Sequence, residues 1–494
     1  MKNIYFNEYN IPMENTIYLP LVSGKLAAYA KTFPQITEAY NFMPPLYKRD
    51  TPENILAQYI NPSVAAFSVS LWNYNLSLEV AQLLKEKFPY CVTIFGGPSA
   101  PFNGTLPNVD YIINGEGERK FVNILARIGG LYPQVLEGID KNIDCFPSPY
   151  VTGEFDMLLK DDMKHQAIIE TNRGCPYLCA YCFWGQGGLN KQYRFHSLDY
   201  IQAEAEWLGR NKIEYVFCAD SNFGMFEKDV EIAQIWADTK ARFGYPEKVR
   251  VCYGKNGEDS IFQVAKILSK AGLAKAITLS RQTNNQEAMQ NVNRKNIKKE
   301  VFDQLQSKYK AKGIPTYTEF ILGLPGETMS SFKKGVMEAL ETSTKIFIYH
   351  CTVLPGTEMA QPEYIAKHGI CTVRVPMSEI HCEIREPGAI QEYEDIIIQT
   401  NTMSKEEWIE CAVNAWLIQL RHSFNITPIP NKIVCKFYEI ACGITEGKPR
   451  GQVDLKFGNI YWEPEELAYL NLTYRTGNPK EFARRKILYG RKGK

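Results

Sequence analysis

The sequence lacks an excess of charge of either sign, and it lacks any long apolar run. It has 56 Lys and Arg residues against 55 Asp and Glu residues, a formal net charge of +1. This balance gives no electrostatic basis for binding nucleic acid or an anionic membrane, so we expect neither as a partner. No uncharged apolar run reaches the roughly 18 residues of a membrane span, and the start of the chain carries no apolar signal segment.

Cysteine is abundant, but its pattern does not indicate disulfides. The chain of 494 residues has 13 cysteines, an odd number, and three of them crowd into the segment 175–182. Disulfide frameworks are typical of short secreted chains with evenly paired cysteines. We therefore expect a cytoplasmic protein with reduced thiols and a metal site.

The length indicates two or three domains, and the first is expected at residues 1–145. Strand-length apolar runs at 63–70, 91–95 and 109–113 alternate with a helical stretch at 76–88 and with glycine turns. This order predicts an α/β fold with a doubly wound, Rossmann-like parallel sheet. Its ligands should bind at the carboxyl ends of the strands.

A second domain is expected at residues 160–355. Helical stretches separate six candidate strands, at 165–171, 215–219, 249–253, 276–279, 316–322 and 345–350. The pattern predicts a partial, open (β/α)6 barrel with its reactive groups on the loops after the strands. Residues 356–494 are less regular and predicted to be mostly helical, with a capping box at Ser404-Lys-Glu-Glu407 ahead of one helix.

The segment Arg173-Gly-Cys-Pro-Tyr-Leu-Cys-Ala-Tyr-Cys182 directly follows the first of these six strands. Its thiols, Cys175, Cys179 and Cys182, can bind three irons of a 4Fe–4S cluster and leave the fourth iron open to a chelating small molecule. The alternatives are a structural zinc site and three unrelated cysteines. Zinc normally takes four protein ligands, and the first histidine after the motif, His196, lies fourteen residues past Cys182. The spacing therefore favours the cluster.

This motif at the end of a first barrel strand resembles that of the radical S-adenosylmethionine (SAM) superfamily, over about residues 160–355. The resemblance implies that SAM chelates the open iron and is cleaved with an electron from a reductant such as flavodoxin or ferredoxin. The resulting 5′-deoxyadenosyl radical would take a hydrogen atom from a C–H bond of the substrate. The resemblance also implies SAM contacts at the strand ends, namely Tyr181, Asp220, Asn222, Lys255, Asn256, Ser280, Arg281, Glu319 and Ile321.

The first domain resembles the cobalamin-binding domain that precedes many radical SAM barrels. The resemblance is carried by Gly96-Gly97-Pro98, by Gly115-Glu-Gly-Glu118 and by Trp72-Asn73. It makes Trp72, Asn73, Gly96 and Gly97 candidate contacts of a bound cobalamin, which would supply a methyl group. The alternative is a domain that keeps the fold and binds no cofactor, or binds a substrate.

Three further cysteines, Cys351, Cys371 and Cys382, lie beyond the cluster motif and are candidate hydrogen donors to a carbon radical. In this respect the chain resembles radical SAM peptide epimerases, and the alternative is that these thiols are buried packing residues. The leading expectation is epimerisation of a residue in a ribosomally made peptide. Cobalamin-dependent C-methylation and a non-enzymatic iron–sulfur carrier are the alternatives.

Overall fold

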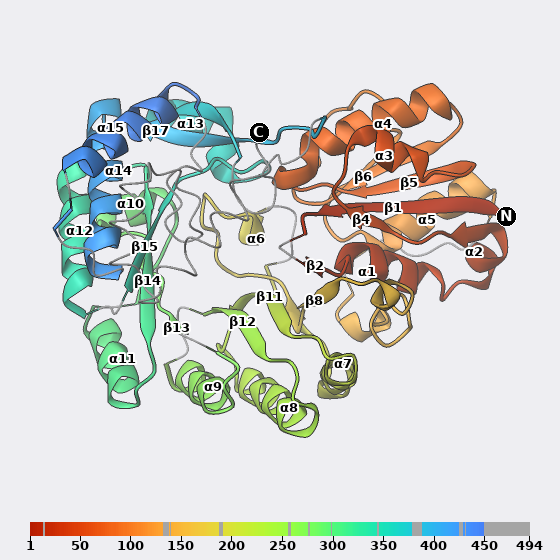
Figure 1. Cartoon of the computed structure of the whole chain (residues 1–494), viewed down its shortest axis with the longest axis horizontal. Coiled ribbons are helices and arrows are strands. Elements are labelled where there is room, and N and C mark those ends of the chain that lie inside the picture. The colour runs from red at the N-terminus through yellow and green to blue at the C-terminus, as the bar shows by residue number, and fades with distance from the viewer. Residues whose placement is uncertain are drawn as a thin grey trace. The chain divides into compact units, whose positions relative to one another are not determined.

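The computed structural model describes residues 1–448 except 13–14, 132–137, 139, 187–190, 255–257, 275–276, 298, 343–344, 378–387, 424–427 and 430. The chain is α/β, as predicted, and its strands pair mainly in parallel (Figure 1). It divides into two compact units. The first comprises Met1–Leu178, Cys182–Lys275 and Gly388–Glu392, and the second comprises Cys179–Tyr181, Ala276–Pro387 and Tyr393–Lys494. The predicted domain boundaries at residues 145, 160 and 355 stay predictions.

A parallel sheet begins the first unit. Its strand order is β3–β1–β5–β6–β7, and β4 also pairs with β1. The strands are β1 (Lys2–Asn10), β3 (Tyr40–Phe42), β4 (Leu46–Lys48), β5 (Pro62–Ser68), β6 (Val92–Gly96) and β7 (Tyr111–Ile113). The order reverses between β1 and β5, and doubly wound sheets bind ligands beside the carboxyl ends of the strands at such a point.

Helices cover both faces of this sheet, as the doubly wound prediction requires. On one face α1 (Leu21–Ala30), α2 (Pro34–Ala39) and α5 (Glu118–Gly129) pack against Ile4 and Phe6 of β1. On the other face α3 (Pro52–Ala57) and α4 (Tyr74–Lys87) pack against Tyr5 and Tyr9. Successive side chains of a strand point to opposite faces, so one strand serves two apolar cores.

A second parallel sheet of the first unit has the order β12–β11–β8–β2. It contains β2 (Thr16–Tyr18), β8 (Lys164–Ile169), β11 (Tyr215–Phe223) and β12 (Lys248–Tyr253), and it packs with α7 (Leu198–Arg210), α8 (Glu227–Phe243) and α9 (Glu258–Lys270). After β8, the short strand β9 (Asn172–Arg173) pairs antiparallel with β10 (Arg194–Phe195). These two strands flank the cysteine motif and the helix α6 (Phe183–Gln186).

The second unit contains the remaining three strands of the predicted barrel, in the parallel order β13 (Ile277–Thr278), β14 (Thr316–Leu322) and β15 (Lys345–His350). All six predicted barrel strands are thus present, and the described strands form no closed barrel. The helices of this unit are α10 (Gln286–Asn291), α11 (Lys299–Ala311), α12 (Met329–Thr342), α13 (Pro362–His368), α14 (Lys405–Ile418) and α15 (Asn431–Thr445), and α14 runs into a π-helix at Gln419–Ser423.

The capping box of α14 is confirmed, because the Ser404 amide donates to the Glu407 carboxylate at 2.8 Å and the Glu407 amide donates to the Ser404 hydroxyl at 3.2 Å. The sequence analysis missed the antiparallel pair β16 (Cys371–Pro376) and β17 (Tyr393–Gln399) in this region. No helix in the described part of the chain has both the length and the hydropathy of a membrane span.

Candidate functional site

The cysteine motif follows β8 and β9, and its thiols are free of disulfides. Cys175 and Cys179 are buried and Cys182 is half-buried. Within the described ranges, no group of three or more His, Cys, Asp or Glu side chains is arranged to hold a single metal ion. Thiolates that bind separate irons of a cubane stand further apart than the ligands of one ion. The donor set of three cysteines fits a 4Fe–4S cluster.

Asp220, a predicted SAM contact, lies at the carboxyl end of β11 and is fully buried. Its carboxylate accepts hydrogen bonds from the Thr171 amide at 2.8 Å, from the Thr171 hydroxyl, and from Nδ2 of Asn172 at 2.7 Å. Burial raises the pKa of Asp220 to about 7, and these hydrogen bonds oppose the rise. The residue therefore holds the segment that leads into the cysteine motif.

The next two residues of β11 contact the motif itself. The Ser221 hydroxyl donates to the carbonyl oxygen of Gly174 at 2.9 Å. Nδ2 of Asn222 donates to Sγ of Cys175 at 3.3 Å and to the Tyr193 hydroxyl at 3.0 Å. The sequence analysis predicted Asn222 to bind SAM, which stays a prediction, and the structure adds a contact with Cys175, a predicted cluster ligand.

Four predicted SAM contacts of the second unit gather around Arg294, which the sequence analysis missed. The buried guanidinium donates to the Tyr181 hydroxyl at 2.9 Å, to the Ser280 carbonyl at 2.8 Å and to the Arg281 carbonyl at 3.2 Å. The Ser280 hydroxyl in turn donates to Glu319 at 2.6 Å. The polar strand ends and the aromatic residue of the cysteine motif thus share one network. No spacing rule points to Arg294, because it lies in the irregular segment after α10.

The candidate hydrogen donors differ in their surroundings. Cys351 is buried in an apolar cluster with Ile321 and Ala180, and its sulfur lies 3.7 Å from Sδ of Met359. Burial raises the pKa of this thiol to about 12. Cys371 is exposed at the start of β16. Their catalytic roles stay predictions. Three other predicted site residues lie outside the described residues, namely Lys255, Asn256 and Cys382.

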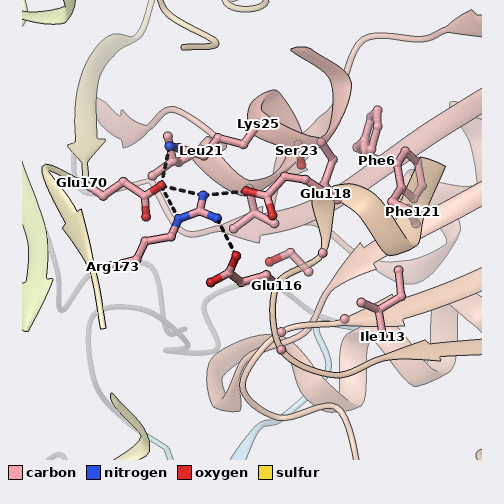
Figure 2. A pocket seen from close by; sticks show the side chains of 18 of the residues that line it. Phe6, Leu21, Ser23, Lys25, Ile113, Glu116, Glu118, Phe121, Glu170 and Arg173 are labelled. Carbon is pink, nitrogen blue, oxygen red and sulfur yellow. Dashed lines mark hydrogen bonds and ion pairs between the residues drawn. The ribbon is translucent and has the colours of Figure 1, made fainter. Parts of the chain in front are cut away.

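A cavity of about 270 Å³ lies at the carboxyl edge of the first sheet (Figure 2). Its walls include Phe6 and Phe121 from the sheet and α5, the strand-end residues Ser68 and Gly96, and Arg173 from β9. The position agrees with the predicted ligand edge of a doubly wound sheet. The cavity is therefore the best candidate of the first unit for a bound cofactor.

The two glycines of the predicted cobalamin contact have different roles. Gly97 has a φ of +103°, and a Cβ atom there would lie 2.6 Å from the carbonyl oxygen of Val69. The backbone of Val69, just after β5, therefore requires this glycine. A Cβ at Gly96 would meet only Ile113, at 3.6 Å or more. Both glycines line the cavity.

Trp72 and Asn73 follow β5 and are absent from the described lining of this cavity. Nδ2 of Asn73 donates to the Ser68 carbonyl at 3.0 Å, and its Oδ1 accepts from the Ser70 amide at 2.8 Å. The Trp72 carbonyl accepts a hydrogen bond from Arg49. The side chain of Asn73 thus ends the strand and begins the short helix η1 (Leu71–Asn73). A role of Trp72 and Asn73 in cobalamin binding stays a prediction.

An ion network forms one wall of the cavity (Figure 2). Arg173 donates to Glu118 at 2.6 Å and to Glu170 at 2.7 Å, and it lies 3.5 Å from Glu116. Lys25 of α1 also binds Glu170. Burial raises the pKa of Glu170, but the two cations outweigh burial and hold that pKa well below its usual range.

The turn Gly115-Glu-Gly-Glu118 therefore anchors the entry to the cysteine motif. Glu118 binds Arg173 of β9, and Glu116 pairs with Arg194 of β10. Arg194 also donates to the Asp140 carbonyl at 2.9 Å. In the sequence analysis this turn carried part of the resemblance to a cobalamin-binding domain. The structure shows that it also connects the first sheet to the segment that carries Cys175.

Comparisons with known proteins agree with this geometry. The model of the radical SAM superfamily matches residues 169–339. The 2-(S-pantetheinyl)-carbapenam-3-carboxylate methyltransferase of Streptantibioticus cattleyicolor is 33% identical over 85% of this chain and 65% of its own length. TokK of Streptomyces tokunonensis, described as a cobalamin-dependent radical SAM methyltransferase, is 30% identical over 99% of this chain and 77% of its own. The chain thus spans less than two thirds of the carbapenam methyltransferase.

A solved structure with the same fold is TsrM of Kitasatospora setae, a radical SAM methyltransferase that holds cobalamin and a 4Fe–4S cluster. Its TM-score is 0.60 and the match covers 91% of this chain and 96% of TsrM, at 14% sequence identity. At this identity the likeness concerns the fold alone.

Proposed function

The chain belongs to the radical SAM superfamily, and we propose that it is a cobalamin-dependent methyltransferase that methylates a carbon atom of a small-molecule substrate. The observation that carries the proposal is the cavity at the carboxyl edge of the first sheet, where a corrinoid would bind. The similarity to TokK over 99% of the chain supports it. The leading expectation from the sequence, epimerisation of a peptide, finds no support among these relatives, and the predicted alternative agrees with them better. The predicted cytoplasmic location remains part of the proposal.

The donor sets of the chain suit the three cofactors of this reaction. When bound, the cluster and SAM supply hydrogen-atom abstraction and cobalamin supplies the transferred methyl group. In our proposal the apolar wall at Phe6, Ile113 and Phe121 would hold the apolar part of a corrinoid. The charged wall at Lys25 and Glu170 would offer hydrogen-bond donors and acceptors to its polar groups.

Arg173 connects the two proposed cofactor sites within one unit. It lines the cavity and precedes Cys175 by two residues, so its ion pairs hold the cluster segment against the cavity wall. Buried ion pairs of this kind fix geometry at a cost in desolvation. We propose that Arg173 positions Cys175 relative to the corrinoid.

A small substrate is proposed because the relative with 33% identity is named for a carbapenam carboxylate. The test uses anaerobic protein with reconstituted cluster, a reductant, SAM, hydroxocobalamin and a pantetheinyl carbapenam carboxylate. We expect S-adenosylhomocysteine, 5′-deoxyadenosine and a product heavier by one methylene. SAM cleavage without methylation of any offered small molecule would contradict the proposed substrate class. A protein that neither binds corrinoid nor cleaves SAM would favour the iron–sulfur carrier.

Two valines of similar exposure, one inside the cavity lining and one outside it, allow a controlled test of corrinoid binding in the cavity. Val22 lines it and is 44% exposed, whereas Val151 is 54% exposed and is not among its lining residues. We expect Val22→Trp to reduce the bound corrinoid, measured by visible absorbance per chain, because the indole narrows the cavity. Val151→Trp should keep full corrinoid, and both variants should keep their iron and sulfide. Equal corrinoid content in both would place the cofactor elsewhere.

A further inference from the structure

We propose that Asn222 donates a hydrogen bond to a cluster-binding thiolate and so raises the reduction potential of the 4Fe–4S cluster. Its Nδ2 lies 3.3 Å from Sγ of Cys175, within range of an N–H···S hydrogen bond. The side chain is only 4% exposed, so bulk water does not compete for this contact. The proposal requires only that the three cysteines bind the cluster, and its test does not depend on whether the protein transfers a methyl group.

The neighbours of Asn222 aim its amide nitrogen at the sulfur. Nδ2 carries two hydrogens, and besides Cys175 it reaches the Tyr193 hydroxyl at 3.0 Å and the Ser221 hydroxyl at 3.0 Å. The charged thiolate of a bound cluster is the strongest of these three acceptors. One hydrogen therefore goes to the sulfur, and the other is shared by the two hydroxyls.

The end of β11 holds the cysteine segment at three successive points. Asp220 accepts from Thr171 and Asn172, and Ser221 donates to the carbonyl of Gly174. These two residues fix backbone and side chains before the motif. Asn222 instead donates to a sulfur, that of Cys175, so its effect on the cluster is distinct from that of its two neighbours.

The sign of the effect follows from charge. One-electron reduction adds negative charge to the cluster and its thiolates, and an N–H dipole directed at a ligand sulfur stabilises that charge. Asn222 therefore favours the reduced state, the state that cleaves SAM. Loss of its N–H group makes the cluster harder to reduce, while the three cysteines still bind it.

The experiment is a redox titration of the reconstituted holoenzyme without SAM, followed by electron paramagnetic resonance. For Asn222→Leu we expect the ratio of reduced to oxidised cluster at a fixed potential to fall several-fold, up to about tenfold, which is about 59 mV for one electron. Asn211→Leu is the matched control, because it makes the same substitution at the exposed end of α7, where the side chain donates only to the Trp207 carbonyl of its own helix among the described contacts. The reduction potential of the cluster in this control variant should match that of the wild type. An unchanged potential in Asn222→Leu overturns the proposal.

A second measurement tests the same contact even if Asn222→Leu fails to bind a cluster. With asparagine labelled by the heavy nitrogen isotope, pulsed resonance of the reduced wild-type cluster should show coupling to an amide nitrogen. The coupling should disappear in Asn222→Asp, which retains the size of the side chain and every other labelled asparagine. Absence of coupling in the wild type, or its persistence in the aspartate variant, also overturns the proposal.

Discussion

Arg173 binds Glu118 at 2.6 Å, and this ion pair joins the strand before the cluster motif to the first turn of α5. The side chain of Glu118 is buried and that of Arg173 is only 11% exposed. The pair is local to the first unit, and it connects two structures that the sequence analysis treated as separate domains. The geometry of the cluster segment therefore depends on the first sheet.

We expect Arg173→Met to lower the thermal unfolding midpoint strongly and to reduce cluster content. Removing one partner of a buried pair leaves uncompensated charge, here on Glu118 and Glu170, and costs about 3–5 kcal/mol. Arg210→Met is the control, since Arg210 pairs with Glu206 at 2.6 Å on the exposed face of α7. An exposed pair on one helix is worth about 0.3–0.5 kcal/mol, so its midpoint should hardly move. Similar shifts of the unfolding midpoint in both variants would show that the Arg173 network stabilises the fold no more than an exposed ion pair does.

Arg294→Met should impair SAM binding more than it impairs folding of the second unit. The variant frees the Tyr181 hydroxyl and the Ser280 carbonyl, which Arg294 holds together. We expect at least about a tenfold rise in the KM for SAM in 5′-deoxyadenosine formation, equivalent to about 1.4 kcal/mol. Lys308→Met, on the exposed face of α11, removes one positive charge away from this network and should retain the wild-type KM. An unchanged KM for SAM in Arg294→Met would show that the hydrogen-bond network around Arg294 takes no part in SAM binding.

Cys351 and Cys371 should differ in reactivity in the native protein. Burial raises the pKa of Cys351 to about 12, so almost no thiolate is present at pH 8, and the sulfur is also inaccessible. Cys371 is exposed. Brief treatment with iodoacetamide followed by peptide mass spectrometry should label Cys371 and leave Cys351 intact. In denaturant both should react. Rapid native labelling of Cys351 would show that the apolar cluster around it opens.

Glu204 should make the protein less stable as the pH rises. It is buried in α7 and accepts a hydrogen bond from Ser148 at 2.7 Å, and burial raises its pKa from 4.5 to about 7. Between these two values the folded state keeps a proton that the unfolded state has released, so stability declines as pH increases from 4.5 to 7. Glu204→Gln should reduce the loss of stability over this pH range by about 3 kcal/mol.

The readout is the thermal midpoint at a series of pH values. Glu206→Gln, two residues along the same helix and half-buried, is the matched variant and should keep the slope of the wild type. If Glu204→Gln also keeps that slope, the carboxyl group is ionised in the folded protein.

The fold was readable from the sequence, and the cluster ligands could be predicted from it, because their signals are local. The strands β8, β11, β12, β14 and β15 are apolar runs between helical stretches, and the cysteines are crowded into eight residues. The strand β1 was missed because Asn3, Asn7, Glu8 and Asn10 interrupt its apolar pattern, although Asn7 and Glu8 are buried and hydrogen-bonded in the structure. A buried polar side chain with a distant partner leaves no periodic signal.

The roles of individual site residues depended on contacts between distant parts of the chain. The position of Asp220 after a strand predicted a SAM contact, which stays a prediction, and the structure adds hydrogen bonds from Thr171 and Asn172 to its carboxylate. Gly97 was predicted to contact cobalamin, which also stays a prediction, and the structure adds a close approach to the backbone of Val69. The sequence could not show these contacts, because their partners lie in distant parts of the chain.

The strand β2 carries a practical consequence for dissecting this protein. Ile17 pairs with His165, so three residues near the amino terminus form the outer strand beside β8, which leads to the cysteines. A fragment that begins near residue 146 would leave the backbone amides and carbonyls of β8 bare along that side. Unpaired strands of this kind recruit other chains. Such a fragment should aggregate on expression, and supplying residues 1–145 as a separate polypeptide should restore solubility by strand complementation.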